Sequence, residues 1–183
     1  MLAKRPKRLL SALRAAFRIV LFLSPLLFGF LPPALAIETI AKQAFLIDMT
    51  TGEVLFEKNA DQPMAPASMS KMMTAYMIFE RLRDGSLTLE DTFTVSENAW
   101  RKGGAKSGGS TMFLEPGKRV KLEDLLRGII VQSGNDACIV VAEALASSEA
   151  AFAEKMTVRA KELGLQNPVF KNATGWPDPE HLT

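Results

Sequence analysis

Apolar and polar positions divide the chain into a short strand-rich part followed by a block of helices. Two apolar runs at 44–48 and 54–57 flank the turn residues 50–52, which is the pattern of a β-hairpin. A further short strand is expected at 92–95. Apolar residues that recur at helical spacing predict helices at 68–84, 122–131, 137–145 and 149–163. Strands that precede a helical block are typical of an α+β fold.

The segment 102–110 departs from this pattern, because it holds four glycines and no apolar side chain larger than alanine. This composition predicts a flexible loop over 101–110. A loop of this kind either decorates the surface or rims a binding site, and its composition alone favours neither.

The first 36 residues have the three parts of a secretory signal. A basic start is followed by an almost wholly apolar run at 19–31, and Ala34-Leu35-Ala36 fits a cleavage site of small residues. A membrane-spanning anchor is the alternative, but a span needs about 20 consecutive apolar residues, and Pro25, Pro32 and Pro33 argue further against it. We therefore expect residues 1–36 to be removed before Ile37 and residues 37–183 to be exported to the periplasm.

Removal of the signal changes the charge, since it carries six of the 22 basic residues and none of the 20 acidic ones. The remainder has 16 basic and 20 acidic residues, a net charge of −4, which gives no indication of nucleic-acid binding. The single cysteine, Cys138, excludes an internal disulfide and is expected in the core. The single histidine, His181, argues against a Ser-His-Asp triad and against a zinc site with two or more histidines.

Ser68 and Lys71 are the first pair of candidate catalytic residues. Three positions apart on a helix, they lie on one face within reach of each other. On a helical wheel this face also carries the apolar residues of the segment, while Ser70, Thr74 and Arg81 fall on the opposite side. Lys71 is therefore expected to point into the protein, where burial lowers the pKa of its amine. A neutral amine there can take the proton of the Ser68 hydroxyl, although Ser-x-x-Lys alone also occurs by chance on protein surfaces.

Ser133 and Asn135 form a second candidate pair, at the break between two predicted helices. Both side chains can project into a cleft there. A serine in that place could relay a proton, and an asparagine amide could hydrogen-bond a substrate amide. By itself, Ser-x-Asn more often caps a helix than takes part in catalysis.

Together the two motifs resemble those of the penicillin-recognising serine enzymes. The best match is to the low-molecular-weight penicillin-binding proteins that act as D-alanyl-D-alanine carboxypeptidases. The likeness includes the segments 65–74, 109–114 and 127–138, and it covers essentially all of 37–183. It implies the serine β-lactamase/transpeptidase-like fold, in which an antiparallel sheet is flanked by helices and joined to a helical subdomain.

The resemblance also implies a role for each of the four residues. Ser68 would be the nucleophile that becomes acylated, and Lys71 the base that activates it. Ser133 would carry the proton to the leaving D-alanine, and Asn135 would hold the substrate's peptide backbone. The Ser68 backbone N–H should supply one donor of the oxyanion hole. The implied substrates are peptidoglycan pentapeptide stems, β-lactams are the implied covalent inhibitors, and no metal or organic cofactor is implied.

The family's third motif, Lys-Thr-Gly on a strand of the cleft, does not occur after Asn135. The resemblance therefore implies that 37–183 is the N-terminal part of the catalytic domain, truncated before the last sheet strands. The relatives also carry a C-terminal β-rich domain and an amphipathic helix that attaches them to the outer face of the cytoplasmic membrane. Turnover is expected of the full-length protein, and the part shown is not expected to hold the complete site.

Two alternatives are open. A class A-like β-lactamase shares the fold and the first motif, but it usually has aspartate where this chain has Gly134, and residues 164–172 contain no acid that could serve in deacylation. A non-catalytic penicillin sensor or peptidoglycan-binding module is not excluded by the fold. Turnover distinguishes the carboxypeptidase from this second alternative.

Overall fold

The computed structural model describes residues 38–182, which fall into two compact units, one up to Ala60 and one from Asp61 onward. The predicted secretory signal at 1–36 and its cleavage before Ile37 lie outside the described residues. Within 38–182, each helix is too short or too polar to serve as a membrane span.

The first unit contains the β-hairpin that the sequence predicts. β1 (Ala44–Ile47) and β2 (Val54–Lys58) pair in antiparallel fashion. The turn between them is held by Asp48, whose carboxylate accepts a hydrogen bond from the backbone N–H of Thr50 at 2.7 Å. Gly52 completes the turn with a φ of 75°, a left-handed conformation that glycine adopts without strain.

The second unit consists of helices with one small sheet. Its strands, β3 (Thr92–Thr94) and β4 (Arg119–Lys121), pair in antiparallel fashion. Its helices are η1 (Ala67–Ser70), α2 (Lys71–Arg83), α3 (Glu97–Gly103), η2 (Ala105–Ser107), α4 (Leu122–Gln132), α5 (Asn135–Ala146) and α6 (Glu149–Glu162). The α+β class is confirmed, with the described strands in two separate two-stranded sheets.

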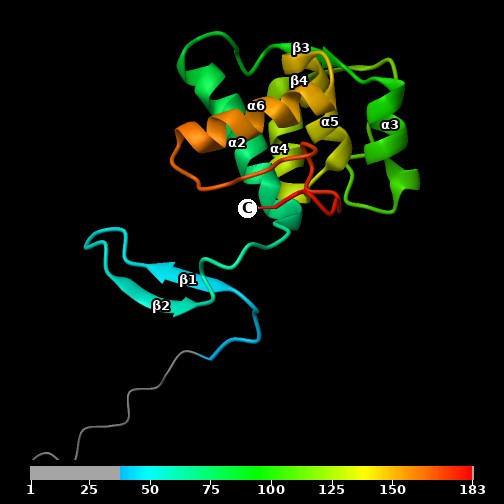
Figure 1. The fold of residues 1–183 in the computed structure, drawn as a ribbon. Helices are drawn as coiled ribbons and strands as arrows, with labels where there is room; N and C mark the ends of the chain where they lie inside the picture. Colours follow the sequence, from blue (N-terminus) through cyan, green and yellow to red (C-terminus); the bar gives the residue numbers. More distant parts are fainter. Residues whose placement is uncertain (1–37, 183) are drawn as a thin grey trace, which may run out of the picture. The chain divides into compact units, whose positions relative to one another are not determined.

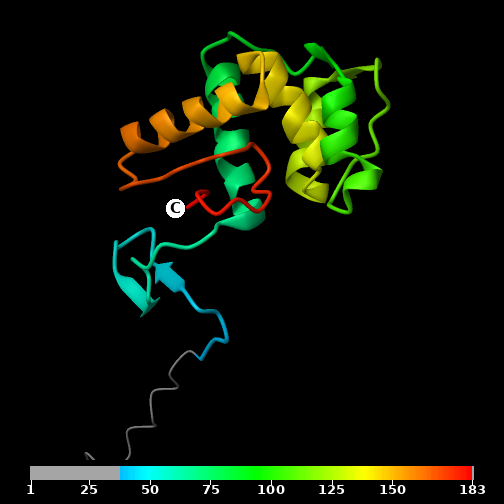
Figure 2. The ribbon, with the colours of Figure 1, turned by 45° about the vertical axis from the view of Figure 1, so that its right-hand side comes forward.

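Helix α5 lies at the centre of the second unit, in contact with α2, α3, α4 and α6. Figures 1 and 2 show α3 along one side of α5 and α6 on the other. Residues 137–142 are all buried, including Cys138, and burial raises the pKa of the Cys138 thiol to about 12. This cysteine is the core residue that the sequence predicts. Because α5 begins at Asn135, its packing fixes the position of the second motif.

Two helices begin at serine N-caps. Ser148 accepts a hydrogen bond from the Ala151 N–H at 3.1 Å, as its position before α6 predicts. Ser96 does the same for α3, accepting from the Ala99 N–H at 2.9 Å.

The burial of α2 corrects the expectation from the helical wheel. Lys71 points inward as predicted, with 6% of its surface exposed, but Ser70 and Thr74 are buried as well. Met72 and Phe79, on the predicted apolar face, are 75% and 48% exposed. The periodicity therefore predicted the orientation of the lysine correctly and that of the two hydroxyl residues wrongly.

The polar side of α2 is buried because the C-terminal segment returns against it (Figures 1 and 2, red). This segment offers hydrogen-bond partners, so burial of the Ser70 and Thr74 hydroxyls costs little free energy. Thr74 Oγ1 donates to the Ala173 carbonyl at 2.7 Å, and Ser70 Oγ lies 2.9 Å from Nε2 of His181. An isolated antiparallel β-bridge between Val169 and Leu182 joins the two ends of this segment.

The glycine-rich segment is more ordered than predicted. Residues 101–103 form the end of α3, and η2 follows at Ala105–Ser107. A Cβ at Gly103 would lie 2.3 Å from the Asp136 nitrogen. The glycine therefore lets α3 lie directly against the start of α5, and this close packing replaces the expected flexible loop.

Candidate active site

Ser68 and Lys71 meet at the junction of η1 and α2. Ser68 lies exposed in the 3-10 turn, and Lys71 is the first residue of α2. Lys71 Nζ lies 3.2 Å from Ser68 Oγ, with the amine as donor in this geometry. The expected contact between the first two candidate residues is confirmed, and it joins an exposed hydroxyl to a buried amine.

The surroundings of Lys71 favour its neutral form. Burial lowers the pKa of its amine below the usual 10.5. In the described part of the chain no carboxylate forms an ion pair with it. Its second partner is neutral, the backbone carbonyl of Thr174, at 2.7 Å from Nζ. With one N–H directed at this carbonyl, the lone pair of a neutral amine is free to face Ser68.

Asn172 shapes the turn that carries this carbonyl. Its side-chain oxygen accepts hydrogen bonds from the N–H groups of Thr174, Gly175 and Trp176 at 2.7–3.2 Å. Its amide nitrogen donates to the Trp176 carbonyl at 2.9 Å. The turn is therefore held from within, and it presents the Thr174 carbonyl to Lys71. Sequence reasoning missed this contribution, because a backbone carbonyl has no residue type to indicate it.

Gly175 brings the same turn against Ala67, the residue before Ser68. Its φ is 77°, and a Cβ there would lie 1.7 Å from the Ala67 carbonyl oxygen. Ala67 itself has a φ of 48°, an uncommon value for a residue other than glycine. The contact thus supports the backbone conformation that presents Ser68.

Ser133 shares a cavity with Ser68 and Lys71. It ends α4 in a left-handed conformation, with a φ of 56°, and the cavity that the three residues line has a volume of about 240 Å³. Among the described residues Ser133 makes no side-chain hydrogen bond to Ser68 or Lys71. The structure therefore brings Ser133 to the site without a direct contact to the other two residues.

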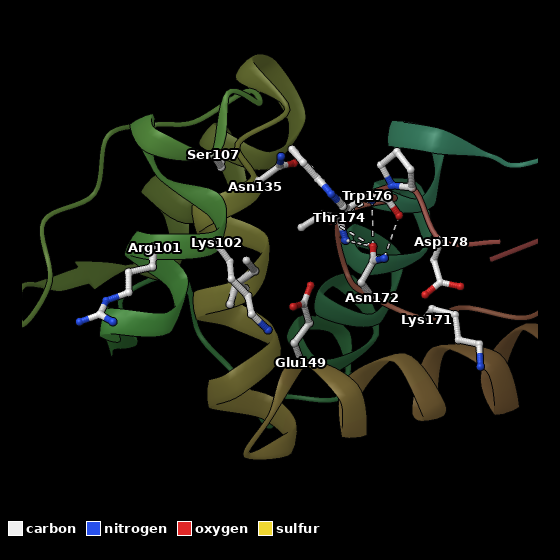
Figure 3. A pocket seen from close by; sticks show the side chains of 12 residues that line it. Arg101, Lys102, Ser107, Asn135, Glu149, Lys171, Asn172, Thr174, Trp176 and Asp178 are labelled. Carbon is white, nitrogen blue, oxygen red and sulfur yellow. Dashed lines mark hydrogen bonds between the residues drawn. The ribbon is translucent and has the colours of Figure 1, made fainter. Parts of the chain in front are cut away.

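Asn135 is buried and lines a neighbouring cavity of about 510 Å³, together with Thr174 and Trp176 (Figure 3). Its backbone N–H donates to the Ser110 carbonyl at 2.8 Å. A Cβ at Gly109 would lie 2.6 Å from the Asn135 amide nitrogen, so only glycine allows this approach. The glycine-rich segment thus rims the site, one of the two outcomes that its composition left open.

Asp136 connects α5 to the segment before it and was not among the expected site residues. It is fully buried, and its carboxylate accepts hydrogen bonds from Thr111 Oγ1 at 2.7 Å and from the Met112 and Leu114 N–H groups at 3.0 Å. A buried carboxylate needs such partners. Asp136 therefore fixes the position of residues 111–114, which follow Ser110, the backbone partner of Asn135.

His181 contacts Ser70 and not Ser68, so the structure contains no Ser-His pair at the candidate nucleophile. The ring packs edge-on against Phe170, and burial lowers its pKa. No group of His, Cys, Asp and Glu within 38–182 has the arrangement of a metal site. The arrangement that remains is a hydroxyl beside a buried amine, suited to forming a covalent acyl-serine.

The family model for peptidase S11, D-alanyl-D-alanine carboxypeptidase, matches residues 32–183. The D-alanyl-D-alanine carboxypeptidase DacF of Bacillus subtilis is 43% identical over 181 residues, which are 97% of this chain and 44% of that protein.

Two solved structures are similar, each with a TM-score of 0.75. The D-alanyl-D-alanine carboxypeptidase DacD of Francisella tularensis is 37% identical, and the match covers 84% of this chain and 36% of that one. Penicillin binding protein 5 of Haemophilus influenzae is 35% identical, and the match covers 85% and 43%. The fold is that of the penicillin-binding proteins, and the chain spans less than half the length of these relatives.

Proposed function

The chain belongs to the peptidase S11 family of D-alanyl-D-alanine carboxypeptidases, and from this premise we propose that the protein removes the terminal D-alanine from peptidoglycan pentapeptide stems through an acyl-enzyme on Ser68. The observation that supports this most directly is the 3.2 Å contact between Ser68 Oγ and the buried amine of Lys71. Histidine is absent from this contact, so lysine serves as the base.

The acylation step begins with neutral Lys71. Its amine takes the Ser68 proton while Oγ attacks the carbonyl carbon of the penultimate D-alanine. The Ser68 backbone N–H donates to the developing oxyanion. The C–N bond then breaks, Ser133 passes a proton to the leaving amine, and the terminal D-alanine departs. The Lys71 ammonium, which keeps the Thr174 carbonyl as an acceptor, then gives the proton it took from Ser68 to Ser133 and replaces the one that Ser133 donated.

Water completes the reaction by attacking the ester carbon. The shortened peptide leaves with a new carboxylate, and Ser68 recovers its proton. Asn135 holds the substrate's peptide backbone from the wall of the neighbouring cavity during both steps. β-Lactams act as covalent inhibitors by acylating the same hydroxyl.

The proposed place of action is outside the cytoplasmic membrane. The basic, apolar and small-residue parts of segment 1–36 support export to the periplasm. Attachment of the full-length protein to the outer face of the cytoplasmic membrane is part of the proposal. Loss of the terminal D-alanine would limit the donors for cross-linking, which connects the activity to cell-wall biosynthesis and cell shape.

The test is to incubate the full-length protein with a peptide that ends in D-Ala-D-Ala and to analyse the products by mass. Free D-alanine and a shortened peptide are the expected products. Cross-linked dimers as the main product would identify a transpeptidase. Rapid opening of penicillin without peptide cleavage would identify a β-lactamase, and acylation without turnover of either would identify a penicillin sensor.

A further inference from the structure

Side-chain hydrogen bonds join the start of α2 to the C-terminal segment 169–182. Some of them end on backbone carbonyls of the turn at 172–176. Another joins two side chains, since Ser70 Oγ lies 2.9 Å from Nε2 of His181. Both residues are buried, each with 2% of its surface exposed. The reaction proposed above does not use this buried pair.

The hydrogen bonds of the His181 ring indicate its tautomer. Nδ1 accepts from the Lys171 backbone N–H at 3.5 Å, so the ring proton belongs on Nε2 and is donated to Ser70 Oγ. A protonated ring would place a second N–H against that of Lys171. Burial lowers the pKa of His181, while the Asp178 carboxylate acts in the opposite direction. The neutral ring is therefore the form that holds Ser70.

The His181 ring is itself held in place by the segment that carries it. It packs edge-on against Phe170, with 5.4 Å between the ring centroids. The backbone N–H of His181 donates to the Asp178 carbonyl at 3.1 Å, and the β-bridge between Val169 and Leu182 lies next to it in the chain. Because the ring belongs to a fixed turn, its bond to α2 restrains the whole segment.

Ser70 directly precedes Lys71, and this connects the buried pair to the proposed base. Lys71 is 6% exposed, and burial is the largest cause of the lowered pKa of its amine. Segment 169–182 provides part of this burial, since the Thr174 carbonyl lies 2.7 Å from Nζ. Cys138 would raise the pKa of the amine if it were charged, but its own pKa of about 12 leaves it neutral at neutral pH.

Movement of this segment away from α2 would expose the Lys71 amine to water. Water would replace the Thr174 carbonyl as a hydrogen-bond acceptor, so the main change would be the loss of burial. The pKa of the amine would then rise toward its usual 10.5. Less of the amine would be neutral at neutral pH, and fewer molecules could take the proton of Ser68.

We propose that His181 is a positioning residue for the reaction, which holds segment 169–182 against α2 through Ser70 and so keeps the Lys71 amine buried. The inference rests on the proposed acyl-enzyme on Ser68 and adds to it a residue that maintains the surroundings of the base. The described hydrogen bonds of the His181 ring are to Ser70 and Lys171. It therefore acts through position and takes no part in the proton transfer.

The test measures acylation of the full-length protein by a fluorescent penicillin across pH. His181→Phe keeps an aromatic ring against Phe170 but has no nitrogen, and Ser70→Ala removes the acceptor. At neutral pH we expect each variant to be acylated about fivefold more slowly, the effect of one buried hydrogen bond. The midpoint of the rate–pH profile should also move upward, toward 10.5. A purely structural loss would lower the amount of active protein without moving this midpoint.

His181→Gln is the rescue variant, because its amide nitrogen can donate to Ser70 from near the position of Nε2. It should keep the midpoint of the unchanged protein and a rate within about twofold. Ser148→Ala is the matched control, since it removes the hydrogen bond to the Ala151 N–H at the start of α6. It should reduce the stability of the protein and leave the midpoint unchanged. Labelling by penicillin counts the active sites in each preparation.

The outcomes separate the two proposals. Midpoints for His181→Phe and Ser70→Ala equal to that of the unchanged protein would overturn the positioning role and leave the acyl-enzyme intact. A His181→Gln profile displaced as far as that of His181→Phe would also overturn it. If His181→Phe does not fold, the comparison of Ser70→Ala with Ser148→Ala decides. Failure of penicillin to acylate the unchanged protein would overturn the acyl-enzyme and the positioning role with it.

Discussion

The proposed chemistry depends on Lys71, the buried amine that contacts Ser68 within the described residues. The residue is 6% exposed, and its amine contacts one hydroxyl and one backbone carbonyl. A surface lysine in the same motif would stay protonated at neutral pH and could not accept a proton. Burial thus turns a common tetrapeptide into a candidate catalytic pair.

Replacing Lys71 with arginine tests its role as the base. Lys71→Arg keeps the positive charge but supplies no neutral amine, so acylation by penicillin should fall by roughly 10²–10⁴-fold, the contribution of a positioned base. In the unchanged protein the acylation rate should rise with pH as the amine loses its proton. The midpoint should lie below 10.5, because burial lowers the pKa. Stopped-flow measurement across pH checks both.

An acylation rate for Lys71→Arg within a few fold of the unchanged protein would show that another group takes the proton. A midpoint at or above 10.5 would contradict the effect of burial on the Lys71 amine.

A contact between single residues could be predicted from the sequence where the two side chains themselves make it. Ser68 and Lys71 could be paired because three positions on a helix place them on one face. The Thr174 carbonyl could not be found, since every residue has one and the contact to Lys71 joins positions 103 apart.

At the scale of elements, the site depends on how three segments meet: η1 with α2, the junction of α4 and α5, and the turn at 172–176. The helices of these segments were predicted from their periodicity, with ends within a few residues of those observed. The helical wheel placed Ser70 and Thr74 on the side away from the core, and this was wrong. Periodicity alone cannot distinguish a polar side that faces solvent from one that a later segment of the chain covers. The turn could not be predicted, since its shape comes from hydrogen bonds to Asn172.

Gly175→Ala tests the contact between this turn and η1. The added Cβ would lie 1.7 Å from the Ala67 carbonyl oxygen, so the turn or η1 must shift, and Ser68 with it. We expect a loss of about 1–3 kcal/mol in the free energy of unfolding and a slower acylation by penicillin. Chemical denaturation and labelling kinetics measure the two effects.

Gly117→Ala is the matched control. Gly117 has nearly the same left-handed conformation, with a φ of 81°, but nothing lies within 4 Å of its added Cβ. It should show only the cost of the conformation, about 1 kcal/mol, with an unchanged acylation rate. Equal effects of the two substitutions on stability and acylation would contradict a role for the Gly175 contact.

At the scale of the whole molecule, all four residues expected at the site belong to the unit from Asp61 onward. Three of them line one cavity, and Asn135 lines the next. The chain spans less than half of the curated relatives it matches. Acylation is the proposed step that can be tested most directly, since Ser68 and Lys71 both lie among the described residues and are in contact.

Covalent trapping tests that claim most directly. The full-length protein is incubated with a fluorescent penicillin, and the labelled residue is identified by peptide mass analysis. We expect one stable adduct on Ser68 and no labelling of Ser68→Ala. An adduct on Ser70 or Ser133, or labelling that persists in Ser68→Ala, would contradict it.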